Sequence, residues 1–189
     1  IGLAAIAAAK GYKFRVYIND FVSIERTQLI QAYGAEVVPF STIDGFKEFY
    51  EASNGDFVAA TKWLAEKVTA AEPEVHFLLQ LENPANPAVH TQTTGPEIWR
   101  DSGGKLDIFI AAVGTGGTLS GTGRYLKQQH PGLQVIAVEP GVGSQPSELR
   151  TEPLEITGVH AFSNQPPERI PSNLVHRVYD EVIAVETWQ

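Results

Sequence analysis

The 189-residue chain contains no cysteine and no methionine. Without cysteine it can form neither a disulfide framework nor a thiolate metal site, and the cytoplasm is the expected location. Its five histidines are scattered without the spacing of metal ligands, so we expect no metal. No apolar run approaches the roughly 18 residues of a membrane-spanning helix, and no signal peptide is recognisable.

Positive charge is also scarce. Fourteen lysines and arginines stand against 22 aspartates and glutamates, which gives a net charge of −8. A broad surface for nucleic acid or for an anionic membrane needs clustered cations, so we expect neither kind of partner. A small pocket for one anion remains compatible with this charge.

The sequence does contain enough apolar material for a core, since 43% of its residues are hydrophobic. Strand patterns alternate with helix-length segments, which predicts parallel pairing and an α/β fold with sheets flanked by helices. We expect helices at 1–9, 24–33, 44–53, 56–70, 87–101 and 117–129. We expect strands at 14–18, 36–40, 75–79, 106–112, 134–138 and 181–185, and irregular structure over most of 140–173.

Asn-Pro occurs twice at 83–87, where we expect the boundary if the fold has two lobes. Asn86 followed by Pro87 is typical of an N-cap with proline at the first helical position. The helix that follows should bend or break at Gly95-Pro96. If the fold has two lobes, we expect residues 1–86 to be part of a smaller N-terminal lobe and residues 87–189 part of a larger one.

The stretch that carries chemistry is Gly114, Thr115, Gly116, Gly117 and Thr118, between a predicted strand and a predicted helix. The glycines allow a sharp turn and a close approach of a ligand to the backbone. The helix that follows directs free N–H groups and its positive dipole end at the loop. With two threonine hydroxyls, this predicts an anion pocket built from neutral donors, which suits a phosphate.

The kind of phosphate follows partly from charge. A nucleoside triphosphate loop needs Lys and then Ser or Thr, whereas Leu119-Ser120 stands here, so a single phosphate monoester is favoured. Gly114-x-Gly116 with Glu139 also approximates a dinucleotide fingerprint, although Leu119 occupies the third glycine position. A glycine-rich turn that binds nothing is the remaining alternative.

Several stretches of the chain match one family pattern. They are Ser-Ile-Glu-Arg at 23–26, Gly-Ala at 34–35, Gln-Leu-Glu-Asn-Pro-Ala-Asn-Pro at 80–87, Thr-Thr-Gly-Pro-Glu-Ile-Trp at 93–99, Gly-Thr-Gly-Gly-Thr at 114–118 and Val-Glu-Pro at 138–140. Together they resemble the cysteine synthase (O-acetylserine sulfhydrylase) family, which belongs to the fold-type II pyridoxal-phosphate enzymes and includes cystathionine β-synthase.

The resemblance implies a two-lobed enzyme that makes L-cysteine by β-replacement, from O-acetylserine or a related activated serine and sulfide. Pyridoxal 5′-phosphate would act as the electron sink. By resemblance, Gly114–Thr118 would hold the cofactor phosphate in the larger lobe, and Gln80 would lie near the substrate carboxylate. A homodimer is also implied, with the C-terminal peptide of a serine acetyltransferase as a candidate partner.

Two other functions stay open. One is a cystathionine β-synthase type of condensation between serine and homocysteine, although the Gly95–Trp99 run is more similar to the cysteine synthase branch. The other is a non-catalytic binding module with the same fold. The segment 158–167 departs from the glycine-rich pattern of the family, which leaves closure of the site and the substrate open but not the cofactor.

We assign no catalytic lysine. The lysines of the chain, none of which stands in a context that matches the family, are Lys10, Lys13, Lys47, Lys62, Lys67, Lys105 and Lys127. In the family, the lysine that binds the cofactor and an asparagine-bearing substrate loop would precede Ile1, and a serine near the pyridine nitrogen would follow Gln189. We therefore expect the intact protein to be longer at both ends.

Overall fold

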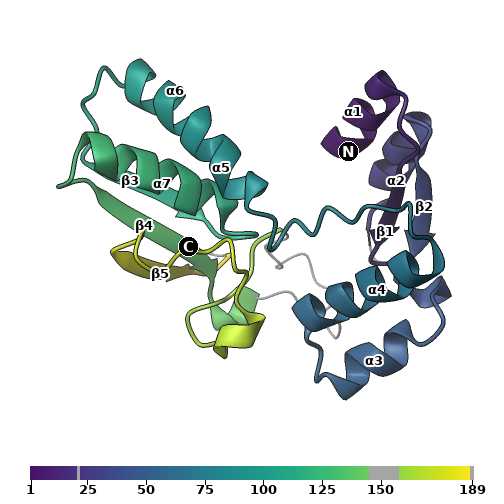
Figure 1. The fold of residues 1–189 in the computed structure, drawn as a ribbon. Coiled ribbons are helices and arrows are strands. Elements are labelled where there is room, and N and C mark those ends of the chain that lie inside the picture. The colour runs from purple at the N-terminus through teal and green to yellow at the C-terminus, as the bar shows by residue number, and fades with distance from the viewer. Residues whose placement is uncertain (21, 145–157, 188–189) are drawn as a thin grey trace. The chain divides into compact units, whose positions relative to one another are not determined.

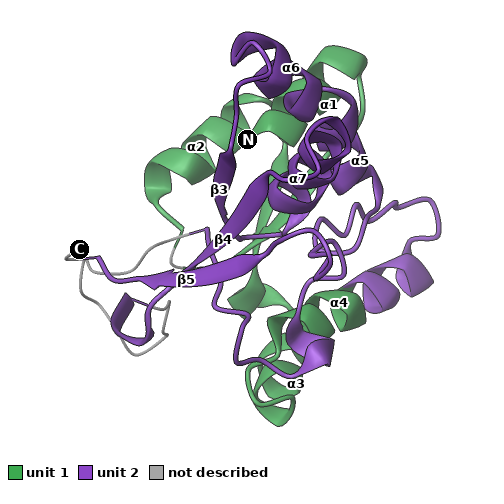
Figure 2. Ribbon diagram, turned by 90° about the vertical axis from the view of Figure 1, so that its left-hand side faces the viewer, with its two compact units in different colours: residues 1–64 green, residues 65–189 purple. Residues whose placement is uncertain are grey.

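The computed structural model describes residues 1–20, 22–144 and 158–187 (Figure 1). The chain forms two compact units, Ile1–Leu64 and Ala65–Gln189, which Figure 2 distinguishes by colour. The division between them falls inside helix α4 (Phe57–Ala71). The lobe boundary expected at residues 86 and 87 lies within the second unit, and the two-lobe division stays a prediction about the intact protein.

The first unit is built on two parallel strands, which pair in register from Arg15 with Glu36 to Ile18 with Pro39. Helix α1 ends where expected, because Gly11 has a φ of 74° and the amides of Gly11 and Tyr12 bond back to the last turn. The elements before α4 are α1 (Gly2–Lys10), β1 (Arg15–Ile18), α2 (Ile24–Ala32), β2 (Glu36–Pro39), the 3-10 turn η1 (Phe40–Thr42) and α3 (Phe46–Ala52).

Two small apolar groups hold this first unit together. Ala4, Ile30 and Ala35 form a buried cluster beside the strands. Aromatic side chains form the other group, in which the rings of Phe40 and Phe46 stack with centroids 4.4 Å apart and Trp63 lies beside Phe46. The predicted helices at 44–53 and 56–70 thus meet through aromatic contacts.

The second unit contains a three-stranded parallel sheet in the order β3-β4-β5. Helix α7 packs on β3 and β4, and α5 and α6 pack against α7 (Figure 1). Because the strands are parallel, their carboxyl ends share one edge of the sheet. The elements are α5 (Ala85–Gln92), α6 (Thr94–Asp101), β3 (Ile108–Ala112), α7 (Gly117–Gln129), β4 (Gln134–Pro140), β5 (Glu181–Val185) and the 3-10 turns η2 (Val142–Ser144) and η3 (Pro167–Arg169).

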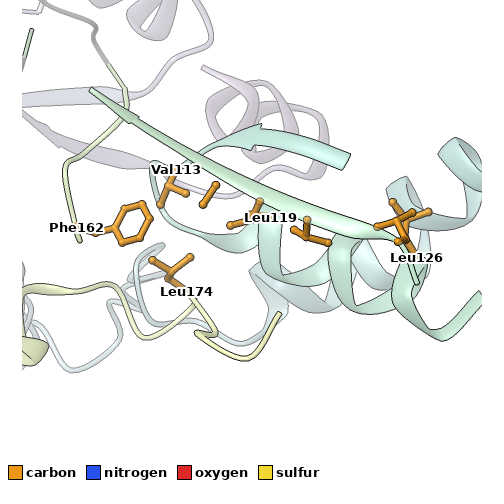
Figure 3. Close-up of a cluster of buried hydrophobic side chains, with 8 residues drawn as sticks. Val113, Leu119, Leu126, Phe162 and Leu174 are labelled. Atoms are coloured by element: carbon orange, nitrogen blue, oxygen red, sulfur yellow. The ribbon is translucent and has the colours of Figure 1, made fainter. Parts of the chain in front are cut away.

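The core of this unit lies between α7 and the sheet (Figure 3). Leu119 and Leu126 point from α7 into the core and are fully buried. Figure 3 shows Val113, Phe162 and Leu174 gathered at one end of this core, with Leu126 at the other. Segments that follow β3 and β4 in the chain are therefore anchored at the end of the core where α7 begins.

The strand expected at 75–79 is wrong. The segment has no strand partner among the described residues, and its conformation is irregular. Leu79 has a φ of 41°, which a strand cannot accommodate, and its carbonyl accepts hydrogen bonds from the amides of Glu82 and Asn83 at 2.9 Å. An apolar run becomes a strand only where a neighbouring strand satisfies its backbone groups.

The helix expected at 87–101 also needs correction. It begins at Ala85, with Pro84 rather than Asn86 at its N-cap, and it is two helices, α5 and α6. The break lies at Thr93, whose φ and ψ of −126° and −69° are not helical, and not at Gly95-Pro96. Pro96 stands in the first turn of α6, where its missing N–H costs no helical hydrogen bond.

The remaining expected elements are present, with ends that differ by no more than a few residues, and the predicted α/β fold with parallel sheets is confirmed. The residues 145–157 of the expected irregular stretch lie outside the described residues. No helix in the described ranges combines the length and the apolar character that crossing a bilayer requires.

Candidate functional site

The predicted phosphate loop lies at the carboxyl end of β3, where α7 begins at Gly117 (Figure 1). Its glycines are required by close neighbours. Gly116 has a φ of 80°, and a Cβ there would lie 2.7 Å from Leu174 Cα. A Cβ on Gly117 would lie 1.9 Å from Asn86 Oδ1, and one on Gly114 would lie 2.5 Å from the Gly158 carbonyl oxygen. The loop is therefore enclosed by three separate segments of the second unit.

The backbone of this loop offers free donors. Thr118 and Leu119 lie in the first turn of α7, where amides have no carbonyl one turn earlier in the helix. In the described part of the chain no partner is found for these two amides, nor for those of Gly114, Thr115 and Gly116. The first helical bond of α7 runs from the Ser120 amide to the Gly116 carbonyl at 3.0 Å. The unpaired N–H groups of the loop thus lie at the N-terminus of a 13-residue helix, which is the positive end of its dipole.

Both threonine hydroxyls of the loop contact side chains of α5. Asn86 Nδ2 donates to Thr115 Oγ1 at 2.9 Å, and the Gly117 amide donates to the same oxygen at 3.3 Å. His90 Nε2 lies 3.3 Å from Thr118 Oγ1, and His90 Nδ1 lies 2.9 Å from Thr94 Oγ1. Asn86 is thus a contact of the loop rather than the N-cap that its sequence context predicts.

Gln80 lies at the same place through its backbone. Its carbonyl accepts hydrogen bonds from Asn86 Nδ2 and from Asn173 Nδ2, both at 2.8 Å, while the residue as a whole is exposed. Asn173 is 3% exposed, and its backbone N–H donates to the Leu81 carbonyl at 3.3 Å. The segment that carries Gln80 is therefore fixed to α5 and to residue 173. The role of the Gln80 side chain stays a prediction.

Glu139 is the next-to-last residue of β4, and its carboxylate is hydrogen-bonded within the chain. Its carboxylate accepts hydrogen bonds from the amides of Phe162 and Ser163 at 2.7 and 3.0 Å and from the Ser163 hydroxyl. Burial raises the pKa of this carboxyl, but the hydrogen bonds from Ser163 and Phe162 outweigh burial, so its pKa lies below the ordinary value. A carboxylate that is 6% exposed and bonded in this way does not face a ribose hydroxyl, which argues against the dinucleotide alternative.

Sequence reasoning missed Asn86, His90 and Asn173 as neighbours of the loop. A signal for the first two was available, because residues four apart share one face of a helix, as do Gly117 and Gly121 on α7. No local signal marks Asn173, which lies 93 residues from its partner Gln80. Within the described ranges no group of three or more acidic or histidine side chains is placed to hold a metal ion.

Comparison with known proteins adds the family. A family model described as "Pyridoxal-phosphate dependent enzyme" matches residues 1–189. The chain belongs to this family of pyridoxal-phosphate dependent enzymes. This membership confirms the resemblance, the fold class and the cofactor expected from the sequence.

The chain is similar to curated members of the pyridoxal-phosphate dependent family. It is 39% identical to cysteine synthase A of Escherichia coli strain K12 and 41% identical to a cysteine synthase of Staphylococcus aureus strain Mu50. Each alignment covers 98% of this chain and 54% of the relative. The chain thus spans about half the length of the curated relatives that it matches.

Solved structures of the family have a fold similar to that of this chain. A hydrogen sulfide-producing enzyme of Fusobacterium nucleatum matches with a TM-score of 0.75 and 32% identity, over 98% of this chain and 56% of that one. An O-ureido-L-serine synthase matches with a TM-score of 0.73 and 31% identity, over 97% and 52%. A cysteine synthase of Entamoeba histolytica matches with a TM-score of 0.72 and 28% identity, over 98% and 50%.

Proposed function

We propose that Gly114–Thr118 binds the phosphate of pyridoxal 5′-phosphate. The observation that carries the proposal is the set of unpaired amides at the start of α7, beside two threonine hydroxyls. Neutral donors at a helix N-terminus suit a single dianionic ester, which needs several charge-assisted hydrogen bonds but no dedicated cation. Glu139, the acidic residue at the neighbouring strand end, is bonded to Phe162 and Ser163 and adds no free carboxylate to the loop.

For the intact protein we propose a β-replacement that makes L-cysteine from O-acetylserine, or a related activated serine, and sulfide. The cofactor supplies an electron sink for loss of the substrate α-proton. The identities of 39% and 41% to named cysteine synthases support this reaction. The hydrogen sulfide-producing enzyme and the O-ureido-L-serine synthase match this chain with TM-scores of 0.75 and 0.73, against 0.72 for the Entamoeba histolytica cysteine synthase, so the nucleophile has to be tested directly.

The Gln80 side chain is proposed to contact the substrate carboxylate. Its backbone is held by Asn86 and Asn173, so the side chain extends from a fixed point beside the loop. If this role is right, Gln80→Ala raises KM for the amino-acid substrate by about tenfold, the effect of losing one hydrogen bond to a charged group. The affinity for the cofactor should not change, and Gln80→Glu should be worse than Gln80→Ala because its charge repels the carboxylate.

Two further expectations for the intact protein rest on the resemblance alone, a homodimer and a contact with the C-terminal peptide of a serine acetyltransferase. The expected cytoplasmic location rests on the lack of cysteine, and the expected lobe boundary near residues 86 and 87 rests on the Asn-Pro segment. The lysine that binds the cofactor covalently is proposed to lie outside these 189 residues, because no lysine here matches the family pattern.

Thr118→Asp tests the phosphate site without weakening α7. An acidic side chain in the first turn of a helix favours the helix dipole, so the free protein keeps its fold, whereas the carboxylate repels a phosphate ester. A side chain at Gly116 would instead meet the backbone of Leu174, which would mix folding with binding. Thr118→Asn is the matched neutral control, since it has nearly the same shape as aspartate.

The measurement is binding to the full-length apoprotein of pyridoxal 5′-phosphate and of pyridoxal, which lacks the phosphate. Thr118→Asp should weaken the binding of pyridoxal 5′-phosphate by at least about tenfold and leave the affinity for pyridoxal unchanged. The affinity of Thr118→Asn for pyridoxal 5′-phosphate should lie between those of wild type and Thr118→Asp. Equal affinity of wild type and Thr118→Asp for pyridoxal 5′-phosphate would refute the phosphate site.

The loaded enzyme is then assayed with O-acetylserine, O-phosphoserine or serine, each with sulfide or homocysteine. Turnover of serine with homocysteine alone would favour the cystathionine β-synthase alternative, and no turnover a binding module.

A further inference from the structure

Asn86 and His90 lie one turn apart on α5, and each contacts a different threonine of the loop. The contact is close because α7 has glycine at the facing positions, Gly117 and Gly121, where a Cβ would lie 1.9 Å from Asn86 Oδ1 and 2.1 Å from the Pro87 carbonyl oxygen. Thr91 also joins the two helices, by donating its hydroxyl to the Gly121 carbonyl at 2.9 Å. One face of α5 is therefore held firmly against the hydroxyls of the loop.

The orientation of the Asn86 amide is fixed by its second partner. The Gln80 carbonyl can only accept a hydrogen bond, so the nitrogen of the Asn86 side chain has to face it. The same nitrogen donates to Thr115 Oγ1, which also accepts from the Gly117 amide. A hydroxyl oxygen has two acceptor positions, and both are filled at Thr115. Any further hydrogen bond of the Thr115 hydroxyl must therefore use its proton, and no acceptor for that proton is found in the described part of the chain.

His90 offers Thr118 two arrangements. In one tautomer, His90 Nε2 carries the proton and donates to Thr118 Oγ1, while Thr94 donates to Nδ1. In the other tautomer, His90 Nδ1 donates to Thr94 Oγ1, and the Thr118 hydroxyl donates its proton to His90 Nε2. Only the first arrangement leaves the Thr118 proton for a ligand, and it also polarises that hydroxyl because a donor is bonded to its oxygen.

We propose that Asn86 and His90 are positioning residues that direct the hydroxyl protons of Thr115 and Thr118 toward the phosphate. This inference rests on the phosphate site proposed above. Neither residue needs to touch the ligand, because each acts through the threonine that it contacts. Binding of the phosphate then selects the His90 tautomer that is protonated at Nε2.

Affinity measurements on full-length apoprotein test His90, whose side-chain hydrogen bonds reach only Thr118 and Thr94 among the described residues. His90→Leu should weaken the binding of pyridoxal 5′-phosphate by about three- to tenfold and leave the affinity for pyridoxal unchanged. His90→Gln should recover most of the loss, because its amide nitrogen can donate where Nε2 did. His130→Leu is the matched control at the far end of α7, and it should change neither affinity. In a Thr118→Val background, His90→Leu should cause no additional loss, because its effect acts through that hydroxyl.

Nitrogen NMR of the His90 ring supplies a second readout that packing alone would not change. Addition of saturating pyridoxal 5′-phosphate should shift His90 to the Nε2-protonated tautomer in wild type, and the shift should be absent in Thr118→Val. An Nδ1-protonated ring in the bound state would overturn the proposal, as would additive losses for His90→Leu and Thr118→Val. If Thr118→Asp binds pyridoxal 5′-phosphate as tightly as wild type does, the phosphate site itself has failed. If Thr118→Asp weakens this binding but Thr118→Val or His90→Leu does not, only the positioning role has failed.

Discussion

Gly121 of α7 faces the backbone of Pro87 on α5, and a Cβ at Gly121 would lie 2.1 Å from the Pro87 carbonyl oxygen. Real Cβ atoms do not approach an oxygen so closely, and a backbone carbonyl cannot rotate away as a side chain can. Glycine at this position therefore sets how closely α5 and α7 approach, and with it the distance from Asn86 and His90 to the loop.

Gly121→Ala should destabilise the protein by about 1–3 kcal/mol, the usual cost of overpacking, because the two helices must separate. The change is measured as the shift of the urea unfolding midpoint. Gly132→Ala is the matched control: a Cβ there would lie 3.5 Å from His130 Nε2, so its effect should stay within about 0.5 kcal/mol. Equal stability of wild type and Gly121→Ala would mean that α5 is free to shift.

Glu139→Gln should destabilise the protein by about 1–3 kcal/mol at neutral pH, because the donors of Phe162 and Ser163 lose a charged acceptor. The pKa of Glu139 lies below its ordinary value in the folded protein, so the carboxylate stabilises the fold above the unfolded pKa of about 4.3. This contribution is lost as the pH falls through the folded pKa.

The difference in unfolding free energy between wild type and Glu139→Gln should therefore be constant near neutrality and shrink below about pH 4.3. Urea titrations across this range measure it. Glu181→Gln makes the same charge change at an exposed carboxylate that begins β5, and it should show no comparable effect. A difference that grows on acidification would contradict the assigned direction of the pKa.

Thr122 and Ser120 make a matched pair on α7, since both are fully buried. The Ser120 hydroxyl accepts a hydrogen bond from the Val175 amide at 2.9 Å, whereas no partner for Thr122 Oγ1 is found in the described part of the chain. Thr122→Val should therefore be neutral or stabilise the fold by up to about 1 kcal/mol. Ser120→Ala should destabilise it by about 1–3 kcal/mol, because the Val175 amide loses its acceptor. Thermal or urea unfolding measures both, and a clear loss in Thr122→Val would mean that its hydroxyl has a partner.

Local sequence was sufficient for the elements whose ends are marked by their own residues. Helix α7 matches the predicted range 117–129, because glycines precede it and His130-Pro131 follows it. The position of Gly114–Thr118 between a strand and a helix was likewise predicted, since its five residues are consecutive, and its phosphate binding stays a proposal.

Local sequence failed where a distant partner decides the structure. Asn86 has the pattern of an N-cap, but its side chain bonds to Thr115, 29 residues later. The apolar run at 75–79 has the composition of a strand, but it lacks a neighbouring strand among the described residues. Glu139 fitted a ribose ligand by spacing, and its actual partners, Phe162 and Ser163, belong to a segment with no periodic pattern. In each case the choice between two locally acceptable roles was made by tertiary contacts.

Gly114→Ala tests whether the segment after Gly158 is held against the loop Gly114–Thr118. A Cβ at Gly114 would lie 2.5 Å from the Gly158 carbonyl oxygen, and the His160 amide donates to the Val113 carbonyl at 2.8 Å. The substitution should push this segment away and break the bond of His160. Overpacking costs about 1–3 kcal/mol, which corresponds to a roughly 5- to 150-fold faster hydrogen exchange of the His160 amide if the cost falls on this contact. Exchange is followed by NMR in the full-length protein, with Gly132→Ala as the control that should leave it unchanged. Unaltered exchange in Gly114→Ala would mean that the two segments move independently, so that residues 158–160 do not help to enclose the loop.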